Sequence, residues 1–308
     1  KALEALPDDA TRAWAQVVLG TGAVGKPATG DEAHFWIGSG ANGKTTLLGG
    51  CMSALGEYAK VIASALLGGH TPGHPTVKME LFRLRLAVVE ELQDGHLLDE
   101  ARLKEITGTD SISAYRMRQD PVVFAPSHTL VCATNHAPVV TGTDHGIWRR
   151  LLSVPFPKRY AGSGQDKTLR MRVRSGRDQR RAILAWLVAG AVAYHRAGML
   201  LPETPEAVRQ RTDKWRYEAD LMLDFLEAEC VFDPAGYVPT GNLLDRFNAY
   251  LTDVAKAKPL SARTFANRID SHELLQREGV RRGRLSGGNR ERVAFGVRFR
   301  TSTSVRTP

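Results

Sequence analysis

The chain has 308 residues, of which 43% are hydrophobic and 24% are charged, close to the averages for globular proteins. No apolar run approaches the roughly 18 residues that a membrane span requires, which excludes an integral membrane protein. The three cysteines, Cys51, Cys132 and Cys230, are scattered without disulfide or zinc-binding spacing. We therefore expect a soluble protein in a reducing, cytoplasmic compartment, with one large domain and a smaller one.

The net charge of +9 is unevenly distributed along the chain. Residues 1–254 contain 29 Lys and Arg against 29 Asp and Glu, whereas residues 255–308 contain 13 against 4. A basic block on a folded segment is typical of a protein that binds a polyanion such as DNA. The alternative interpretation is a solvated basic tail.

In chain order, the first predicted elements are a helix and a strand–loop–helix unit. Residues 1–20 carry apolar side chains at helical spacing and end at Gly20. The run HFWIG (34–38) predicts a buried strand, and KTTLLGGCMSALGEYA (44–59) has helical periodicity. The glycine-rich segment between them therefore follows the carboxyl end of a strand.

Strands and helices continue to alternate up to Pro157, which indicates an α/β core. LFRLRLAVVEEL (81–92) and HTLVCATN (128–135) predict buried strands, with a helix over residues 97–107 after the first. The pattern around Asp120-Pro121 predicts a β-hairpin. Beyond Pro157 the sequence predicts two long amphipathic helices, at 180–200 and 205–230.

The C-terminal segment predicts helices at 242–256 and 262–276 and then two strands, VRRGRL (280–285) and RVAFGVRF (292–299). Val293, Phe295, Val297 and Phe299 alternate to one side of the second strand. Helices followed by a basic hairpin, with a turn at Ser286-Gly287-Gly288-Asn289, predict a winged helix-turn-helix. The expected domains are an N-terminal helical segment (1–30), an α/β core (31–160), a helical connector (161–235) and a winged-helix DNA-binding domain (236–308).

A P-loop is the most specific motif of the sequence. Residues Gly38–Thr45 satisfy the pattern G-x-x-x-x-G-K-[ST], in which backbone N–H groups form an anion nest. Lys44 would reach the β- and γ-phosphates, and the Thr45 hydroxyl would bind magnesium, so we expect ATP and Mg²⁺ as cofactors. The alternative is a glycine-rich turn without nucleotide. The predicted nucleotide-binding residues are Gly38, Ser39, Gly40, Ala41, Asn42, Gly43, Lys44, Thr45 and Thr46.

Five further residues, at three places along the chain, are candidates for groups that ATP hydrolysis requires. Glu90 and Glu91, after four apolar residues, are candidates to hold Mg²⁺ with Thr45, partly through water, and to polarise the attacking water. The alternative for the two glutamates is a solvated acidic helix start. Asn135 is a candidate to position that water, and its alternative role is a strand-end cap. Arg149 and Arg150 could neutralise charge at the γ-phosphate, or lie in surface salt bridges.

At these residues the chain resembles a known family. GSGANGKTTLL, LRLAVVEEL, KEITGTDSISAYRMRQDPVVF, LVCATNHAPVV and TGTDHGIWRRLLSVPF occur in the order and at the intervals of the superfamily 3 helicase domain. The resemblance, strong over residues 10–160, is to phage and plasmid primase-helicases related to poxvirus replicative helicases. It implies an AAA+-like, three-layer α/β P-loop core.

The resemblance also implies roles for single residues and for partners. Lys44 and Thr45 would be Walker A groups, Glu90 and Glu91 Walker B acids, and Asn135 the sensor. Arg149 or Arg150 would be an arginine finger for the ATP of a neighbouring subunit in a hexameric ring. In this chain the two acids are adjacent, and Gln93 stands where the family has another acid. This leaves open which glutamate is the catalytic base, although Glu91 falls where the family's glutamate would.

We also expect contacts to single-stranded and forked DNA. In the family, the segment between the Walker B strand and the sensor forms a hairpin that touches DNA. The alternative for the arginines of this segment is that they lie on an exposed hairpin face without contacting DNA. A primase domain, if the natural protein primes, is expected before Lys1, because no primase-type carboxylate cluster is present. The candidate DNA contacts are Lys104, Arg116, Arg118, Arg263, Arg268, Arg281, Arg282, Arg284, Arg290 and Arg292.

Three functions are compatible with the sequence. The first is an ATP-dependent replicative DNA helicase of the primase-helicase type. The second is an origin-binding initiator that uses ATP as an assembly switch without processive unwinding. The third is an ATPase whose basic tail binds a partner protein.

Overall fold

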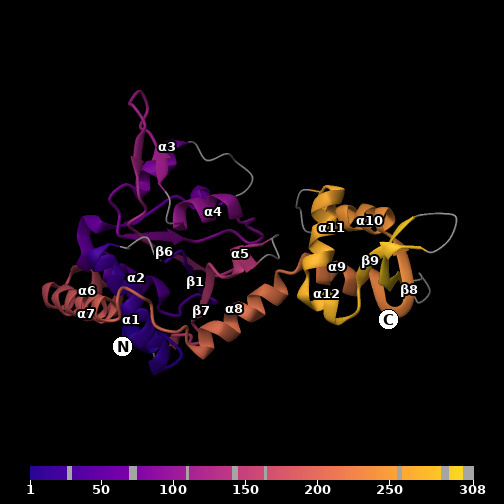
Figure 1. Cartoon of the computed structure of the whole chain (residues 1–308). Coiled ribbons are helices and arrows are strands. Elements are labelled where there is room, and N and C mark those ends of the chain that lie inside the picture. The colour runs from indigo at the N-terminus through magenta and orange to yellow at the C-terminus, as the bar shows by residue number, and fades with distance from the viewer. Residues whose placement is uncertain are drawn as a thin grey trace. The chain divides into compact units, whose positions relative to one another are not determined.

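A computed structural model describes residues 1–25, 30–68, 75–108, 111–140, 145–162, 165–254, 259–285 and 291–300. The chain forms two compact units, Lys1–Tyr217 and Glu218–Pro308 (Figure 1). Among the described residues, no helix is long and apolar enough to cross a membrane. The expected α/β class is confirmed: the first unit holds a five-stranded parallel sheet and the second a small antiparallel sheet.

The parallel sheet of the first unit has the strand order β2-β3-β6-β1-β7. Its central strands are buried along their whole length, as expected for strands that are covered on both faces. All carboxyl ends of these strands therefore meet at one edge of the sheet. The strands are β1 (Ala33–Ile37), β2 (Ala59–Val61), β3 (Leu86–Glu90), β6 (Thr129–Thr134) and β7 (Leu151–Pro155).

Helices cover both faces of this sheet. Trp36 and Val88 face a core formed with α1, α2 and α7. On the opposite face, the ring centroid of Phe35 lies 5.0 Å from that of Trp215 in α8. The helices of this unit are η1 (Ala2–Ala5), α1 (Asp9–Val24), α2 (Lys44–Leu55), η2 (Gly56–Tyr58), η3 (Ser64–Leu66), α3 (Pro75–Lys78), η4 (Met79–Leu81), α4 (Glu100–Thr107), α5 (His145–Trp148), α6 (Leu169–Ser175), α7 (Arg177–Arg196) and α8 (Glu206–Glu218).

The predicted hairpin around Asp120-Pro121 is confirmed by two antiparallel strands, β4 (Ile112–Ala114) and β5 (Val122–Phe124). It projects from the first unit (Figure 1). Its tip exposes Met117, with 76% of its surface accessible.

The second unit follows the order α9 (Leu221–Glu229), β8 (Cys230–Pro239), α10 (Thr240–Asp253), α11 (Ala262–Ser271), α12 (Glu273–Arg277), β9 (Arg281–Arg284) and β10 (Arg292–Phe299). Its sheet has the order β8-β10-β9. Phe225, Phe247 and Phe265 form the aromatic centre of a separate core. The unit therefore has the hydrophobic core of a small independent domain.

Two helix predictions were wrong, and strands β2, β7 and β8 were not predicted. The helix expected over 205–230 is two helices, because the Asp220 carboxylate accepts the backbone N–H of Leu223 and starts α9. The helix expected over 262–276 is divided at His272. Strand β8 was missed, since Pro234 and Gly236 interrupt its pattern.

The two units also divide differently from the expected domains. The division lies between Tyr217 and Glu218, ahead of the boundary expected at 235/236. Trp215, expected in a connector, is 1% exposed in the core of the first unit, and α9 contributes Phe225 to the core of the second.

The expected alternation of four apolar residues along β10 was wrong as well. The pairing register shifts between Phe295 and Val297, where Gly296 has φ of +84°. Because this β-bulge reverses which face the next residues take, Val297 packs in the core with Ala294, and Phe295 stays on the other face. The turn expected at 286–289 lies outside the described residues.

Candidate nucleotide-binding site

The P-loop lies at the carboxyl edge of the parallel sheet, between β1 and α2. Gly40, Ala41 and Gly43 all have positive φ, at 63°, 49° and 90°. This run of left-handed residues turns successive backbone N–H groups toward one point, which is the geometry of an anion nest. A Cβ at position 38 would lie 2.9 Å from the backbone carbonyl oxygen of Phe156, so packing favours glycine there.

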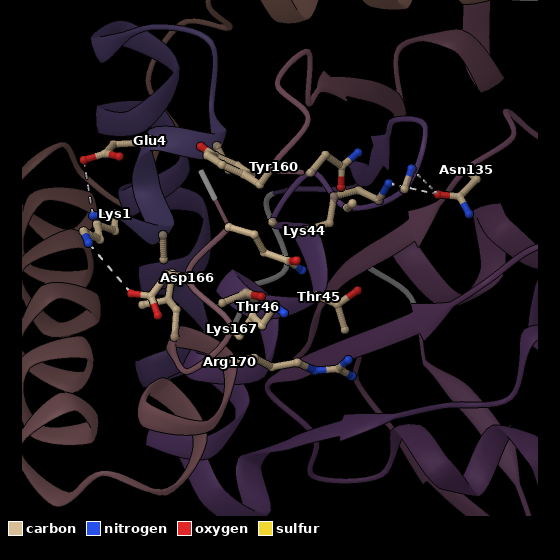
Figure 2. A pocket seen from close by; sticks show the side chains of 18 of the residues that line it. Lys1, Glu4, Lys44, Thr45, Thr46, Asn135, Tyr160, Asp166, Lys167 and Arg170 are labelled. Carbon is tan, nitrogen blue, oxygen red and sulfur yellow. Dashed lines mark hydrogen bonds and ion pairs between the residues drawn. The ribbon is translucent and has the colours of Figure 1, made fainter. Parts of the chain in front are cut away.

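Lys44 and Asn135 meet in this loop although they are far apart in sequence (Figure 2). The Lys44 Nζ atom donates to the Gly38 carbonyl at 2.5 Å and to Asn135 Oδ1 at 3.3 Å. Asn135 Oδ1 also accepts the N–H of Gly40 at 3.2 Å. Asn135 follows β6, which is paired in parallel with β1, so the two strand ends bring these groups together.

Burial lowers the pKa of Lys44 to about 8, because the charged ammonium loses contact with water. The whole residue is only 5% exposed. A phosphate group in the loop would restore a strong electrostatic partner to the ammonium and favour its protonated form.

A pocket of about 480 Å³ opens over the loop. Its lining includes Lys44, Thr45, Thr46, Asn135 and Glu91, which are residues that the sequence pointed to. Its volume fits a molecule of the size of a nucleoside triphosphate.

Of the two candidate acids, only Glu91 lines this pocket within the described part of the chain. Glu90 is the last residue of β3 and pairs with Ala133 of β6. Glu91 leaves the strand with φ of +58°, and its N–H donates to the Ala133 carbonyl at 3.0 Å. This left-handed residue turns the second carboxylate away from the direction of the first.

Sequence reasoning missed the residues that form the rest of the pocket. Tyr160 donates its backbone N–H to the Ala41 carbonyl at 2.8 Å, and Arg170 reaches the pocket from α6 (Figure 2). Gly49 and Gly50 of α2 allow α6 to approach closely, since a Cβ at Gly49 would lie 2.5 Å from the Arg174 guanidinium. No local motif marks these residues, because they come from separate segments of the chain.

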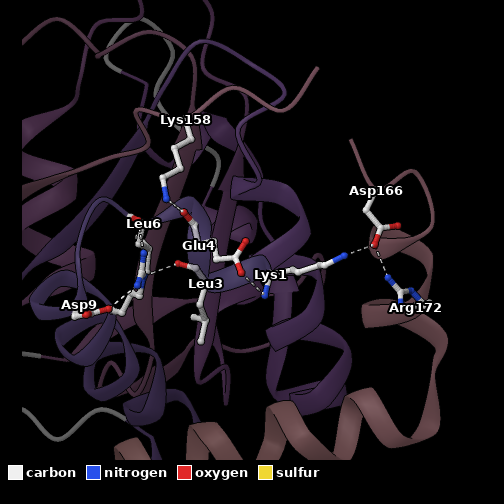
Figure 3. A network of polar contacts seen from close by, with 9 residues as sticks. Lys1, Leu3, Glu4, Leu6, Asp9, Lys158, Asp166 and Arg172 are labelled. Atoms are coloured by element: carbon white, nitrogen blue, oxygen red, sulfur yellow. Dashed lines mark hydrogen bonds and ion pairs between the residues drawn. The ribbon is translucent and has the colours of Figure 1, made fainter. Parts of the chain in front are cut away.

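A polar network holds η1 beside the pocket (Figure 3). Lys158 donates to the Glu4 carbonyl at 2.7 Å, and Arg12 donates to the Leu3 carbonyl at 3.1 Å. The Asp166 carboxylate accepts a hydrogen bond from Arg172 at 2.5 Å. A hydrogen bond from the Thr168 hydroxyl holds the pKa of the Asp166 carboxyl below its usual range.

The two predicted finger arginines lie away from the chain's own pocket. Both form ion pairs with Asp31, which precedes β1, at 2.7 Å from the same carboxylate oxygen. Asp31 is therefore at the amino edge of the sheet, whereas the P-loop is at its carboxyl edge. The five residues of β1 between them span roughly 16 Å.

The candidate DNA contacts lie on both units. Lys104 is on α4, Arg116 and Arg118 are at the tip of the β4–β5 hairpin, and Arg263 and Arg268 are on α11. Arg282 forms a close ion pair with Asp270. Arg281 and Arg284 are exposed on β9, Arg292 is exposed at the start of β10, and Arg290 lies outside the described residues.

Fold and site together define a P-loop protein with a site for a nucleoside triphosphate. Residues 36–150 match a family described only as a family of unknown function, DUF5906. The chain is 25% identical over 242 residues to a "Putative helicase" of Acanthamoeba polyphaga mimivirus, covering 71% of the chain and 24% of that protein. The predicted resemblance to viral helicases and primases is thereby confirmed.

Two further viral proteins are similar to the chain. A "Putative helicase" of Frog virus 3 (isolate Goorha) is 26% identical over 65% of the chain and 22% of its own length. A "Putative primase" of African swine fever virus (isolate Warthog/Namibia/Wart80/1980) is 29% identical over 47% of the chain and 16% of its own length. The chain thus spans about a quarter or less of these relatives.

Among solved structures, the apo C-terminal region of NrS-1 is similar in fold. The TM-score is 0.51 at 12% sequence identity, and the match covers 96% of the chain and 74% of that structure. At this identity the likeness supports the fold alone.

Proposed function

We propose that this chain is the ATP-hydrolysing motor of a replicative DNA helicase of the primase-helicase type. The observation that carries the proposal is the meeting of Lys44, Asn135 and Glu91 around one P-loop pocket. These are the cation, the polar sensor and the carboxylate that in-line attack of water on a γ-phosphate requires. The similarity to viral helicases and to a viral primase supports a role in replication.

Each residue has a distinct part in the proposed reaction. Lys44 neutralises charge on the β- and γ-phosphates, and the backbone nest holds the phosphate oxygens. The Glu91 carboxylate orients and polarises the attacking water, while Asn135 fixes its position. These groups act by placement and by electrostatics, because phosphoryl transfer asks for little covalent chemistry from the protein.

The pocket also fits Mg²⁺. The Thr45 hydroxyl and the Glu91 carboxylate line it together, and oxygen atoms of this kind are the ligands that Mg²⁺ prefers. Thr45 would bind the ion directly, and Glu91 would hold it through water. When bound, Mg²⁺ supplies further neutralisation of the phosphate charge.

The position of Arg149 and Arg150 supports a shared active site. Because both lie at the opposite edge of the sheet from the P-loop, neither is placed to reach the chain's own nucleotide. We therefore propose that an arginine enters the pocket of a neighbouring subunit, in a ring that we take to be hexameric.

DNA contacts are proposed at two places. The exposed hairpin tip with Arg116 and Arg118 would touch single-stranded DNA in the ring. The second unit would be a winged helix-turn-helix, a proposal supported by its order of helix, strand, three helices and a strand pair. Its α11 would be the helix that contacts duplex DNA.

The experiment that tests the proposal compares steady-state ATPase and fork unwinding in the wild type and Lys44→Ala. Loss of both activities is expected, because no other described side chain takes the place of the ammonium in the nest. Lys60→Ala is a matched control, since Lys60 is an exposed lysine of β2 outside the pocket. Unchanged activity in Lys44→Ala would refute the ATPase assignment.

A second function is an ATP-regulated initiator that binds a replication origin. The observation that favours it is the exposed face of α11, where Arg263 and Asn267 are four residues apart. Arg and Asn side chains are able to form paired hydrogen bonds with guanine and adenine. Competition between an origin duplex and random duplex at fixed salt separates the functions, because an initiator must prefer the origin.

A further inference from the structure

The outer face of the second unit's sheet carries an unusual row of side chains. Phe295 of β10 is paired with Tyr237 of β8 on one side and with Arg281 of β9 on the other. Directly opposed residues of antiparallel strands point to the same face. The three side chains therefore form one row across the sheet.

This row faces away from the core of the second unit. The neighbouring pair Val238 and Ala294, on the other face, is buried in that core. Tyr237 is 49% exposed, Phe295 is half-buried and Arg281 is exposed. The bulge at Gly296 maintains this arrangement, because without it the apolar residues that follow could not return to the core.

The two rings lie near each other with their planes inclined by 56°, and the Arg281 guanidinium lies over the Phe295 ring. The centroids of Tyr237 and Phe295 are 6.4 Å apart, and the Arg281 guanidinium carbon lies 5.2 Å from the Phe295 centroid. Gly283 is next to this row, and a Cβ there would come within 2.7 Å of the Phe295 ring. A glycine at this position thus lets the ring lie across β9.

The charge around the row is suited to an anionic ligand. Arg281 of β9 is exposed on the face of the row, whereas Arg284 and Arg292, opposed to each other on β9 and β10, lie on the other face. Asp233 of β8, an acid of the same sheet, is occupied by an ion pair with Arg298 at 3.0 Å. Aromatic faces combined with a nearby arginine match a ligand that has flat rings on a phosphate chain.

We propose that Tyr237, Phe295 and Arg281 form a base-stacking site for single-stranded nucleic acid. Unpaired bases stack on the aromatic row, and Arg281 contacts the phosphates. This site is distinct from the α11 face proposed for duplex DNA. It rests on the proposed function only in taking nucleic acid as the partner, and it requires no ATP hydrolysis.

The test uses the full chain without nucleotide and two probes of equal length and charge. One is an oligothymidylate, and the other is the same sugar–phosphate chain without bases. Stacking predicts that the wild type binds the oligothymidylate more tightly, because the abasic chain has the phosphates but no rings. Equal affinity for both probes would overturn the proposal.

Tyr237→Ala is expected to weaken binding of the oligothymidylate about tenfold and to leave binding of the abasic chain unchanged. Tyr237→Phe should retain wild-type affinity, since it keeps the ring. Tyr217→Ala, which removes another exposed tyrosine, is the matched control. Arg281→Ala should weaken both probes, because it removes a phosphate contact.

The outcomes separate this site from the proposed motor. Lys44→Ala should bind both probes like the wild type, because Lys44 is buried in the P-loop. An active ATPase in which Tyr237→Ala binds the oligothymidylate normally would refute the stacking site and leave the motor assignment intact. If the chain binds the oligothymidylate in a base-dependent way but has no ATPase activity, the motor assignment is refuted and the stacking site is retained.

Discussion

Asp31 and Arg150 form a partly buried ion pair, in which a carboxylate oxygen lies 2.7 Å from a terminal guanidinium nitrogen. The Arg150 side chain is 14% exposed and also donates to the Gly146 carbonyl at 2.6 Å. Arg149 shares the same carboxylate but is 46% exposed. Asp31 therefore holds both arginines, and Arg149 is the more exposed of the two.

The first prediction follows for the arginine finger. Arg149→Ala should lower the ATPase kcat by roughly 10³-fold or more while ATP still binds, as for other arginine fingers. Mixing Arg149→Ala subunits with Lys44→Ala subunits should restore part of the activity, because an intact P-loop then meets an intact finger. Steady-state ATPase of the mixtures is the measurement.

The control for this experiment is Arg177→Ala, which removes an exposed arginine at the start of α7. It should have wild-type kcat. Mixtures that show no more activity than the separate variants would argue against an arginine acting between subunits.

The second prediction concerns the two adjacent acids. Because Glu91 lines the pocket and Glu90 does not, Glu91→Gln should reduce kcat by about 10²- to 10⁴-fold, the usual range for loss of a general base. ATP affinity should remain close to that of the wild type. Glu90→Gln should have the smaller effect on kcat; the reverse order would assign the base to Glu90.

The third prediction is a pH dependence of nucleotide binding. The pKa of Lys44 is about 8 in the free protein, so the ammonium is protonated below this pH and loses its proton above it. ATP affinity should therefore fall as the pH rises through about 8, and binding at higher pH should take up a proton. Calorimetry in buffers of different ionisation enthalpy measures this uptake, which Lys44→Ala should lack.

The fourth prediction concerns the contact between α1 and α7. A Cβ at Gly190 would lie 2.0 Å from the Gln16 carbonyl oxygen, which is backbone and cannot rotate away. Gly190→Ala should therefore lower the free energy of unfolding by about 1–3 kcal/mol or more, as overpacking does. Urea denaturation followed by circular dichroism measures it.

Gly241 of α10 is the matched control for that substitution. Nothing lies within 4 Å of a Cβ there. Gly241→Ala should raise the free energy of unfolding by up to about 1 kcal/mol, because alanine restricts the unfolded chain. Equal effects of both substitutions would contradict the close approach of α1 and α7.

The sequence by itself determined the phosphate loop and the order of strands and helices around it. A P-loop is a contiguous unit, so the spacing of Gly38, Gly43 and Lys44 already defines its chemistry. The central strands β1, β3 and β6 were equally visible, because strands covered on both faces are continuous apolar runs, whereas β2 and β7 were not predicted. These features depend on residues that are neighbours along the chain.

Tertiary structure decided which distant residues share the site. The pairing of β1 with β6 brings Asn135 to Lys44, and a left-handed turn at Glu91 selects between two adjacent acids. The ion pair with Asp31 distinguishes Arg149 from Arg150 by burial. Such relationships arise from strand pairing, backbone turns and burial, which act between segments far apart in sequence and so leave no local pattern.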